Sequence, residues 1–165
     1  MIVVDVNILA NYTIKGARTK EAHRLWALND YWIVPSFWRI EIQSVLWKYV
    51  RFQGMSKNEA LAVMEQAIQF FSGNEQDIAP GVALQEAISS GISVYDAQYV
   101  ALARQLNIPC VTLDKALQKA CPDRVVLIDA FLSNRPGDGL IREASNAYKL
   151  KGSRKRTQKK VVARD

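Results

Sequence analysis

Cysteine, histidine and long apolar runs are all scarce in this sequence. Its two cysteines, Cys110 and Cys121, have neither the CxxC spacing of a metal site nor the density of a disulfide scaffold. The one histidine, His23, cannot anchor a zinc site, and we expect it on the surface or half-buried in a helix. Apolar runs such as residues 1–4 and 125–128 fall far short of the roughly 20 residues that a membrane-spanning helix needs. The sequence therefore predicts neither a disulfide scaffold, nor a zinc protein, nor a membrane-spanning protein.

Several common catalytic and targeting motifs are missing as well. There is no GxxxxGK[ST], GxGxxG or GxSxG segment, and neither cysteine has a histidine nearby in the sequence. The first residues lack a basic segment followed by an apolar stretch and a cleavage site, as a secretory signal would require. We therefore expect a cytoplasmic protein whose cysteines stay reduced.

The composition indicates one globular domain followed by a basic tail. The chain has 165 residues, about the length of one domain, with 49% apolar and 23% charged residues. Its net charge is +6, but residues 149–165 hold eight basic residues and one acidic residue, which leaves 14 basic and 15 acidic residues before them. We expect a nearly neutral folded body and a tail that is disordered when free.

Strand-like apolar segments alternate with amphipathic helical segments along the body. The expected strands are 2–5, 32–34, 76–79, 110–113 and 125–128, and the expected helices are 18–29, 36–52, 57–71, 81–90, 93–107 and 115–120. Ser36 is expected to cap the second helix, and Ser56 with Glu59 forms a capping box for the third. Strands separated by helices pair in parallel, so the pattern predicts a three-layer α/β/α sandwich.

Two aspartates stand at the ends of predicted strands. Asp5 closes the first strand and Asp114 closes the strand at 110–113. The carboxyl ends of parallel strands line the binding crevice of an open sheet, which places both at one edge. Asp114 is equally well explained as the N-cap of the helix at 115–120. Capping explains Asp5 less well, because Asn7 is the better cap for a helix that begins at Ile8.

Two further carboxylates lie at unusual positions on predicted helices. Glu41 falls within the apolar stripe of its helix, where a glutamate would face the core without an evident local partner; the stripe comprises Trp38, Ile42, Val45, Tyr49 and Phe52. Asp96 follows Ser93 by three residues and could simply complete a capping box, although glutamate or glutamine is usual there. It is the set of four acids that indicates a site.

Four carboxylates at one sheet edge would repel one another and raise their own pKa values unless a cation were bound. Ligands that are all oxygen select hard ions, and Mg²⁺ or Mn²⁺ held by a few carboxylates is the usual partner of phosphate chemistry. Such a site hydrolyses phosphodiesters: one metal activates water, and a second, about 4 Å away, can stabilise the leaving oxygen.

Four segments of the chain resemble the motifs of the PIN-domain family. They occur in the family's order within residues 1–132 and are Val4-Asp5-Val6-Asn7, Pro35-Ser36 followed by Glu41, Tyr95-Asp96-Ala97 followed by Tyr99-Val100-Ala101-Leu102-Ala103, and Thr112-Leu113-Asp114. The resemblance implies a five-stranded parallel sheet. It also implies that the metal ligands and catalytic residues are Asp5, Glu41, Asp96 and Asp114, with Asn7 and Thr112 orienting them.

The commonest members of this family are VapC-like toxins of toxin–antitoxin pairs, which are ribonucleases dependent on Mg²⁺ or Mn²⁺. The resemblance thus implies an RNA substrate and a cognate antitoxin as partner. A housekeeping PIN nuclease in RNA processing or decay, and a catalytically silent RNA- or protein-binding module, remain alternatives. Two positions depart from the family pattern: Val6 stands where a small hydroxyl residue is common, and Leu117 where an aromatic residue often follows.

The sequence after the nuclease-like body, residues 1–132, has a different character. Residues 133–148 are expected to form a linker and a short helix that packs on the body or against a second subunit of a homodimer. The basic tail, 149–165, is either a solvated solubility tail or an electrostatic trap for RNA, and a membrane surface fits less well because apolar anchors are missing. In the RNA interpretation the binding residues are Lys151, Arg154, Lys155, Arg156, Lys159 and Lys160.

Overall fold

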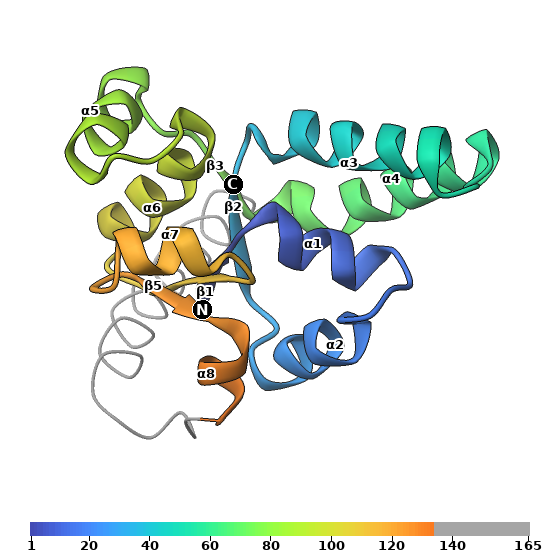
Figure 1. The fold of residues 1–165 in the computed structure, drawn as a ribbon, viewed down its shortest axis with the longest axis horizontal. Helices are drawn as coiled ribbons and strands as arrows, with labels where there is room; N and C mark the ends of the chain where they lie inside the picture. Colours follow the sequence, from blue (N-terminus) through green and yellow to red (C-terminus); the bar gives the residue numbers. More distant parts are fainter. Residues whose placement is uncertain (134–165) are drawn as a thin grey trace, which may run out of the picture.

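A computed structural model, which describes residues 1–133, contains a five-stranded parallel sheet between two layers of helices (Figure 1). This confirms the three-layer α/β/α sandwich expected from the sequence. The strands lie in the order β3-β2-β1-β4-β5, and their bounds are β1 (Ile2–Val4), β2 (Trp32–Pro35), β3 (Glu75–Gln76), β4 (Cys110–Thr112) and β5 (Val125–Leu127).

Strand β1 occupies the centre of the sheet. Val3 pairs with Ile33 of β2 on one side and with Cys110 of β4 on the other, and all three residues of β1 are buried. A strand covered on both faces needs apolar residues at every position, which explains why Ile2, Val3 and Val4 follow one another without polar alternation.

Helices cover both faces of the sheet and enclose two apolar cores. Helices α1 (Val6–Thr13), α2 (Thr19–Leu28), α3 (Trp38–Phe52), α4 (Lys57–Phe71) and α8 (Ile128–Ser133) surround the first core. Helices α5 (Pro80–Ser90), α6 (Val94–Leu106) and α7 (Lys115–Ala120) surround the second core. Val4 points into the first core and Val3 into the second, as the alternation of a strand requires.

The order of the strands creates a switch point between β1 and β4. From β1 the chain adds β2 and β3 on one side, and it then returns across the sheet to add β4 and β5 on the other. The crossovers on the two sides therefore use helices of opposite layers. Where strand order reverses in this way, the carboxyl ends of the two central strands border a binding crevice.

Most expected elements are confirmed, with local differences. The capping box of Ser56 and Glu59 at α4 is present, and Ser93 caps α6 through the backbone N–H of Asp96. Helix α8 was not expected, because its first residue belongs to the segment 125–128 that the sequence favours as strand. Phe52, expected in the apolar stripe of α3, is 69% exposed, because this end of α3 lies away from the sheet (Figure 1).

The expected starts of two helices are wrong. Ser36 does not cap α3: its backbone N–H donates to the carbonyl of Gln76 and extends the pairing of β2 with β3, so the helix begins at Trp38 with Phe37 as the N-cap residue. Helix α1 begins at Val6 rather than Ile8, which places Asp5 at the N-cap position and Asn7 inside the helix.

The scarce residues behave as the sequence predicts. Cys110 and Cys121 are buried free thiols, and His23 is exposed on α2. Among the helices of residues 1–133, none combines the length and the apolar character needed to cross a bilayer. The predicted linker helix and basic tail lie outside the described residues, and the boundary near residue 132 stays a prediction.

Candidate functional site

Asp5 is a buried carboxylate at the carboxyl end of the central strand. Its exposed fraction is 4%, and its Oδ2 accepts hydrogen bonds from Asn7 Nδ2 at 2.5 Å and Thr112 Oγ1 at 2.6 Å. Burial raises the pKa of Asp5 to about 6; the hydrogen bond from Thr112 opposes this shift, and the charge of Asp96 adds to it.

Asn7 and Thr112 connect Asp5 to strand β4. Asn7 Nδ2 also donates to Thr112 Oγ1 at 3.0 Å, and Asn7 Oδ1 accepts from the backbone N–H of Leu113 at 3.0 Å. Asn7 is therefore not a helix cap, contrary to one sequence-based expectation, because its side-chain amide bridges β1 and β4. Asn7 and Thr112 thus hold the Asp5 carboxylate between the ends of the two central strands.

Glu41 lies on α3 and receives a hydrogen bond from the opposite layer. Tyr99, a fully buried residue of α6, donates its hydroxyl to Glu41 Oε2 at 2.5 Å. Burial raises the pKa of Glu41 to about 7; the bond from Tyr99 opposes this shift, and the charges of Asp5 and Asp96 add to it. No local partner for Glu41 is evident in the sequence, because its partner lies 58 residues away. The only signal was that Tyr99 follows Asp96 by three residues and so shares its helix face.

Asp96 is both a capping residue and a member of the acidic site. Its backbone N–H donates to Ser93 Oγ at 3.1 Å, and the Ser93 hydroxyl donates to Asp96 Oδ2 at 2.7 Å. Its charge acts on the pKa values of both Asp5 and Glu41. The expected capping box is therefore only half formed: Ser93 caps the backbone N–H of Asp96, while the carboxylate of Asp96 accepts from the Ser93 hydroxyl. We call Asp5, Glu41 and Asp96 the acidic trio.

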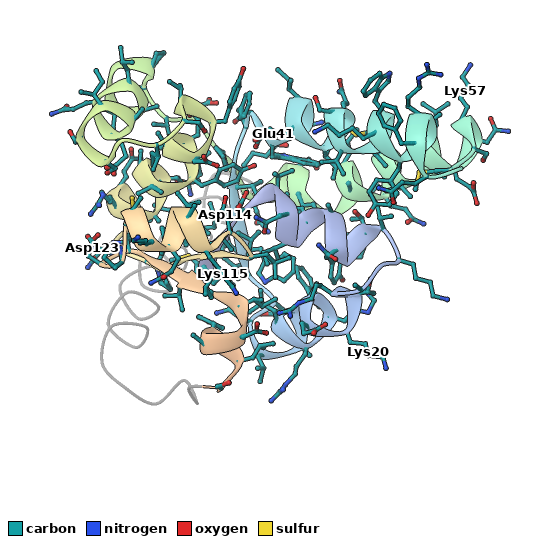
Figure 2. All side chains as sticks on the ribbon, viewed as in Figure 1. Lys20, Glu41, Lys57, Asp114, Lys115 and Asp123 are labelled. Atoms are coloured by element: carbon teal, nitrogen blue, oxygen red, sulfur yellow. The ribbon has the colours of Figure 1, made fainter. Side chains whose placement is uncertain are left out.

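Asp114 has a different environment from the trio. Its carboxylate caps α7, with Oδ1 accepting from the backbone N–H groups of Ala116 at 2.6 Å and Leu117 at 3.2 Å. The backbone N–H of Asp114 donates to Thr112 Oγ1 at 3.0 Å, and the same hydroxyl donates to Asp5. The Thr112 side chain thus links Asp114 to Asp5. In Figure 2, Glu41 and Asp114 both lie toward the middle of the molecule, whereas Lys20, Lys57 and Asp123 lie at its periphery.

The trio brings together negative charge that the described residues do not balance. Within residues 1–133 every ion pair involves other acids, namely Glu21, Glu75, Glu86, Asp123 and Asp129. Burial raises the pKa values of Asp5 and Glu41, and the charge of Asp96 adds to both shifts, so this group of carboxylates suits a hard divalent cation, which prefers oxygen ligands. In the same part of the chain no three histidine, cysteine or acidic side chains are already arranged as a metal site.

The fold and the site define an α/β sandwich with an acidic cluster at its switch point. A family model described as PIN domain matches residues 2–123, and the chain belongs to this family. This confirms the resemblance drawn from the four sequence segments.

Similar proteins agree with this assignment. The chain is 28% identical over 124 residues to a protein named Ribonuclease VapC3 from Pyrobaculum aerophilum, a match that covers 73% of this chain and 95% of the relative. The crystal structure of PAE2754 from the same organism superposes with a TM-score of 0.63 at 18% identity, over 80% of this chain and 86% of that one. FitAcB from Neisseria gonorrhoeae gives 0.58 at 17% identity, over 76% and 96%. The two structures show that the fold is shared.

The raised pKa of Asp5 predicts that the stability of the metal-free protein falls as pH rises. Because the folded state binds this proton more tightly than the unfolded state, Asp5 lowers the free energy of unfolding progressively from about pH 4 to pH 6, by about 3 kcal/mol in all. Asp5→Asn should therefore be more stable than wild type at pH 8 with EDTA present, and should lose this advantage near pH 4. Urea unfolding followed by circular dichroism measures both.

Asp123→Asn is a control for which the opposite dependence of stability on pH is expected. Arg104 donates a hydrogen bond that lowers the pKa of Asp123, so this carboxylate stabilises the fold above its unfolded pKa and loses the effect as pH falls. Asp123→Asn should be slightly less stable than wild type near neutral pH. Identical pH profiles for wild type and Asp5→Asn would show that burial does not raise the pKa of Asp5.

The hydrogen bond between Tyr99 and Glu41 predicts a pH-dependent effect of Tyr99→Phe. At pH 8 the variant loses a bond to a charged acceptor, worth about 1.5–3 kcal/mol, and at pH 5 it loses a neutral bond worth about 0.5–1.5 kcal/mol. A double-mutant cycle with Glu41→Gln isolates the coupling. Tyr12→Phe is the matched control, since no hydrogen bond to the Tyr12 hydroxyl exists among the described residues; equal losses in the two variants would contradict the prediction.

Proposed function

We propose that this chain is an endoribonuclease that hydrolyses RNA phosphodiester bonds with Mg²⁺ or Mn²⁺, and that it acts as the toxin of a toxin–antitoxin pair. The observation that carries the proposal is the acidic trio: Asp5 follows β1, Glu41 lies on α3 and Asp96 lies on α6. Burial and neighbouring charge raise the pKa values of Asp5 and Glu41, and none of the three acids forms an ion pair within residues 1–133. Membership of the PIN domain family and similarity to a protein named Ribonuclease VapC3 support it.

Asp5, Glu41 and Asp96 would hold the cation, with Asp114 as the fourth ligand. The bound ion supplies positive charge against the phosphate and makes water a better nucleophile. Asn7 and Thr112 fix Asp5 Oδ2. The Tyr99 hydroxyl bonds to one oxygen of Glu41, and the Ser93 hydroxyl bonds to one oxygen of Asp96. The second oxygen of each carboxylate is left to coordinate the ion. Both capping bonds of Asp114 go to its Oδ1. Its Oδ2 would therefore be the oxygen that binds the ion while Oδ1 continues to cap α7.

The proposed partner is a cognate antitoxin protein. The name VapC belongs to the similar ribonuclease, and one solved structure of the same fold is FitAB bound to a DNA fragment, with a TM-score of 0.58 at 19% identity. A short open reading frame beside this one, encoding a DNA-binding protein that inhibits the nuclease, would identify the antitoxin. Light scattering on the purified chain would test whether it forms the homodimer considered from the sequence.

The activity predicts that purified full-length protein cuts RNA with Mg²⁺ or Mn²⁺ and not in excess EDTA. Asp96→Asn should lower the cleavage rate by about 100-fold or more, because a ligand charge that supports several kcal/mol of stabilisation is lost. It should keep the fold, because its backbone N–H still bonds to Ser93. Asp123→Asn removes an exposed carboxylate elsewhere and should cut at the wild-type rate. Equal cleavage in EDTA, or by Asp96→Asn, would contradict the proposal.

Residues 149–165 are proposed to capture RNA through their charge. Each phosphate neutralised on a single strand contributes about −0.7 to the slope of log affinity against log salt, so three or four contacts add roughly −2 to −3. The candidates are Lys151, Arg154, Lys155, Arg156, Lys159 and Lys160. Deleting 149–165 should weaken binding at low salt and flatten this slope, while cleavage at saturating RNA persists. Equal slopes for both proteins would favour the solubility interpretation.

A further inference from the structure

Two aromatic rings beside the acidic trio have no part in the chemistry described so far. Phe37, at the start of α3, and Tyr95, in the first turn of α6, are stacked with centroids 5.3 Å apart and planes inclined by 22°. Tyr95 is 60% exposed and Phe37 is half-buried. One face of the tyrosine ring is thus covered by Phe37, and much of the rest is open to solvent. We call these two residues the aromatic pair.

The aromatic pair lies next to two of the three carboxylates. Phe37 precedes Glu41 by four residues, with helical backbone angles at Phe37, so their side chains lie on the same face of α3 with Cβ atoms about 5–6 Å apart. Tyr95 directly precedes Asp96 in α6. The stack of Tyr95 on Phe37 therefore joins the starts of α3 and α6, whose first turns carry Glu41 and Asp96.

The chemistry of this surface selects its ligand. An exposed aromatic face favours a flat ring, and single-stranded RNA is commonly recognised by stacking of its bases on such rings. The neighbouring carboxylates disfavour an anionic ring but tolerate a neutral one. A nucleobase is neutral, flat and joined to the phosphate that the cation-loaded trio would bind. We infer that Phe37 and Tyr95 form a stacking site for an unpaired nucleobase adjacent to the bond that is cut; this inference rests on the proposed function.

The inference defines the substrate more closely. A base stacked on Tyr95 cannot remain stacked within a duplex, so the enzyme would act on single-stranded segments or loops. Stacking discriminates weakly between bases, because each of them has a π-face. The aromatic pair would therefore contribute to affinity at the cut site, and the trio would contribute to the chemical step.

The pair also joins α3 to α6, and the test must separate this structural role from base stacking. Tyr95→Phe keeps the ring, Tyr95→Leu keeps apolar bulk without a π-face, and Tyr95→Ala removes both. Phe52→Ala is the matched control, since Phe52 is an exposed aromatic residue at the other end of α3. Thermal unfolding of each variant reports any loss of stability.

Single-turnover cleavage of a short unstructured RNA with a mapped cut site, with Mg²⁺ present, gives the half-saturating protein concentration and the maximal rate separately. Tyr95→Ala and Tyr95→Leu should raise the half-saturating concentration by roughly 5- to 150-fold with the maximal rate unchanged. Tyr95→Phe and Phe52→Ala should resemble wild type. A fall in maximal rate that parallels a loss of stability in Tyr95→Ala, with wild-type behaviour of Tyr95→Leu, would overturn the inference in favour of a purely structural role.

An RNA lacking one base beside the cut site completes the test. In wild type the missing base should weaken binding by about the same factor as Tyr95→Ala, and in Tyr95→Ala it should have no further effect. Additive losses at every abasic position would overturn the stacking site while leaving the nuclease intact. If wild-type protein cuts no RNA, the proposed function fails; quenching of 2-aminopurine in a short RNA by wild type, and not by Tyr95→Ala, would then still report stacking.

Discussion

The carboxylate of Asp5 is held almost out of water at the end of the central strand, and the surrounding structure is organised around this costly placement. An ionised side chain in such a position is tolerated only with hydrogen-bond donors or a counter-charge. Asn7 and Thr112 supply donors from both sides of the β1–β4 junction, and through Leu113 they also fix the path of the chain leaving β4. No described basic side chain is paired with it. The same contacts that stabilise the switch point thus hold a carboxylate there that no described basic side chain balances.

The acidic site lies beyond the carboxyl end of β1, where residues from both helical layers come together. Asp5 belongs to the sheet, Glu41 comes from the layer around the first core, and Asp96 comes from the layer around the second. Contacts from α6 to α3 join these layers: the hydroxyl of Tyr99 bonds to Glu41, and the ring of Tyr95 stacks on Phe37. Tyr95 and Tyr99, which stand on either side of Asp96 in the sequence, thus both link α6 to α3.

Local patterns in the sequence predicted most strands and helices and singled out the four carboxylates. They did not predict contacts between residues that are far apart in the sequence. The apolar runs ending in Asp5 and Asp114 located two strand ends, because a doubly covered strand has a clear composition. The prediction that Ser36 caps α3 is wrong because β2 pairs with β3, some forty residues on, and this pairing uses the backbone N–H of Ser36. The partnership of Tyr99 with Glu41 was missed for the same reason. Whether Asp114 caps a helix or binds a ligand cannot be read from sequence, since both uses need a carboxylate at the same position.

Asp96 and Glu59 show how one methylene separates a purely structural cap from a cap that also serves a site. In α4, Glu59 reaches back to the backbone N–H of Ser56 and completes the reciprocal box. In α6, Asp96 occupies the same position, but its shorter side chain bonds to the hydroxyl of Ser93 instead. Its carboxylate therefore stays close to the helix start, where it acts on the pKa values of Asp5 and Glu41, and one of its oxygens remains available. A glutamate would form the better box and move the charge away from the site. The aspartate that looks like an imperfect cap in the sequence thus combines a bond to the capping serine with a charge that acts on Asp5 and Glu41.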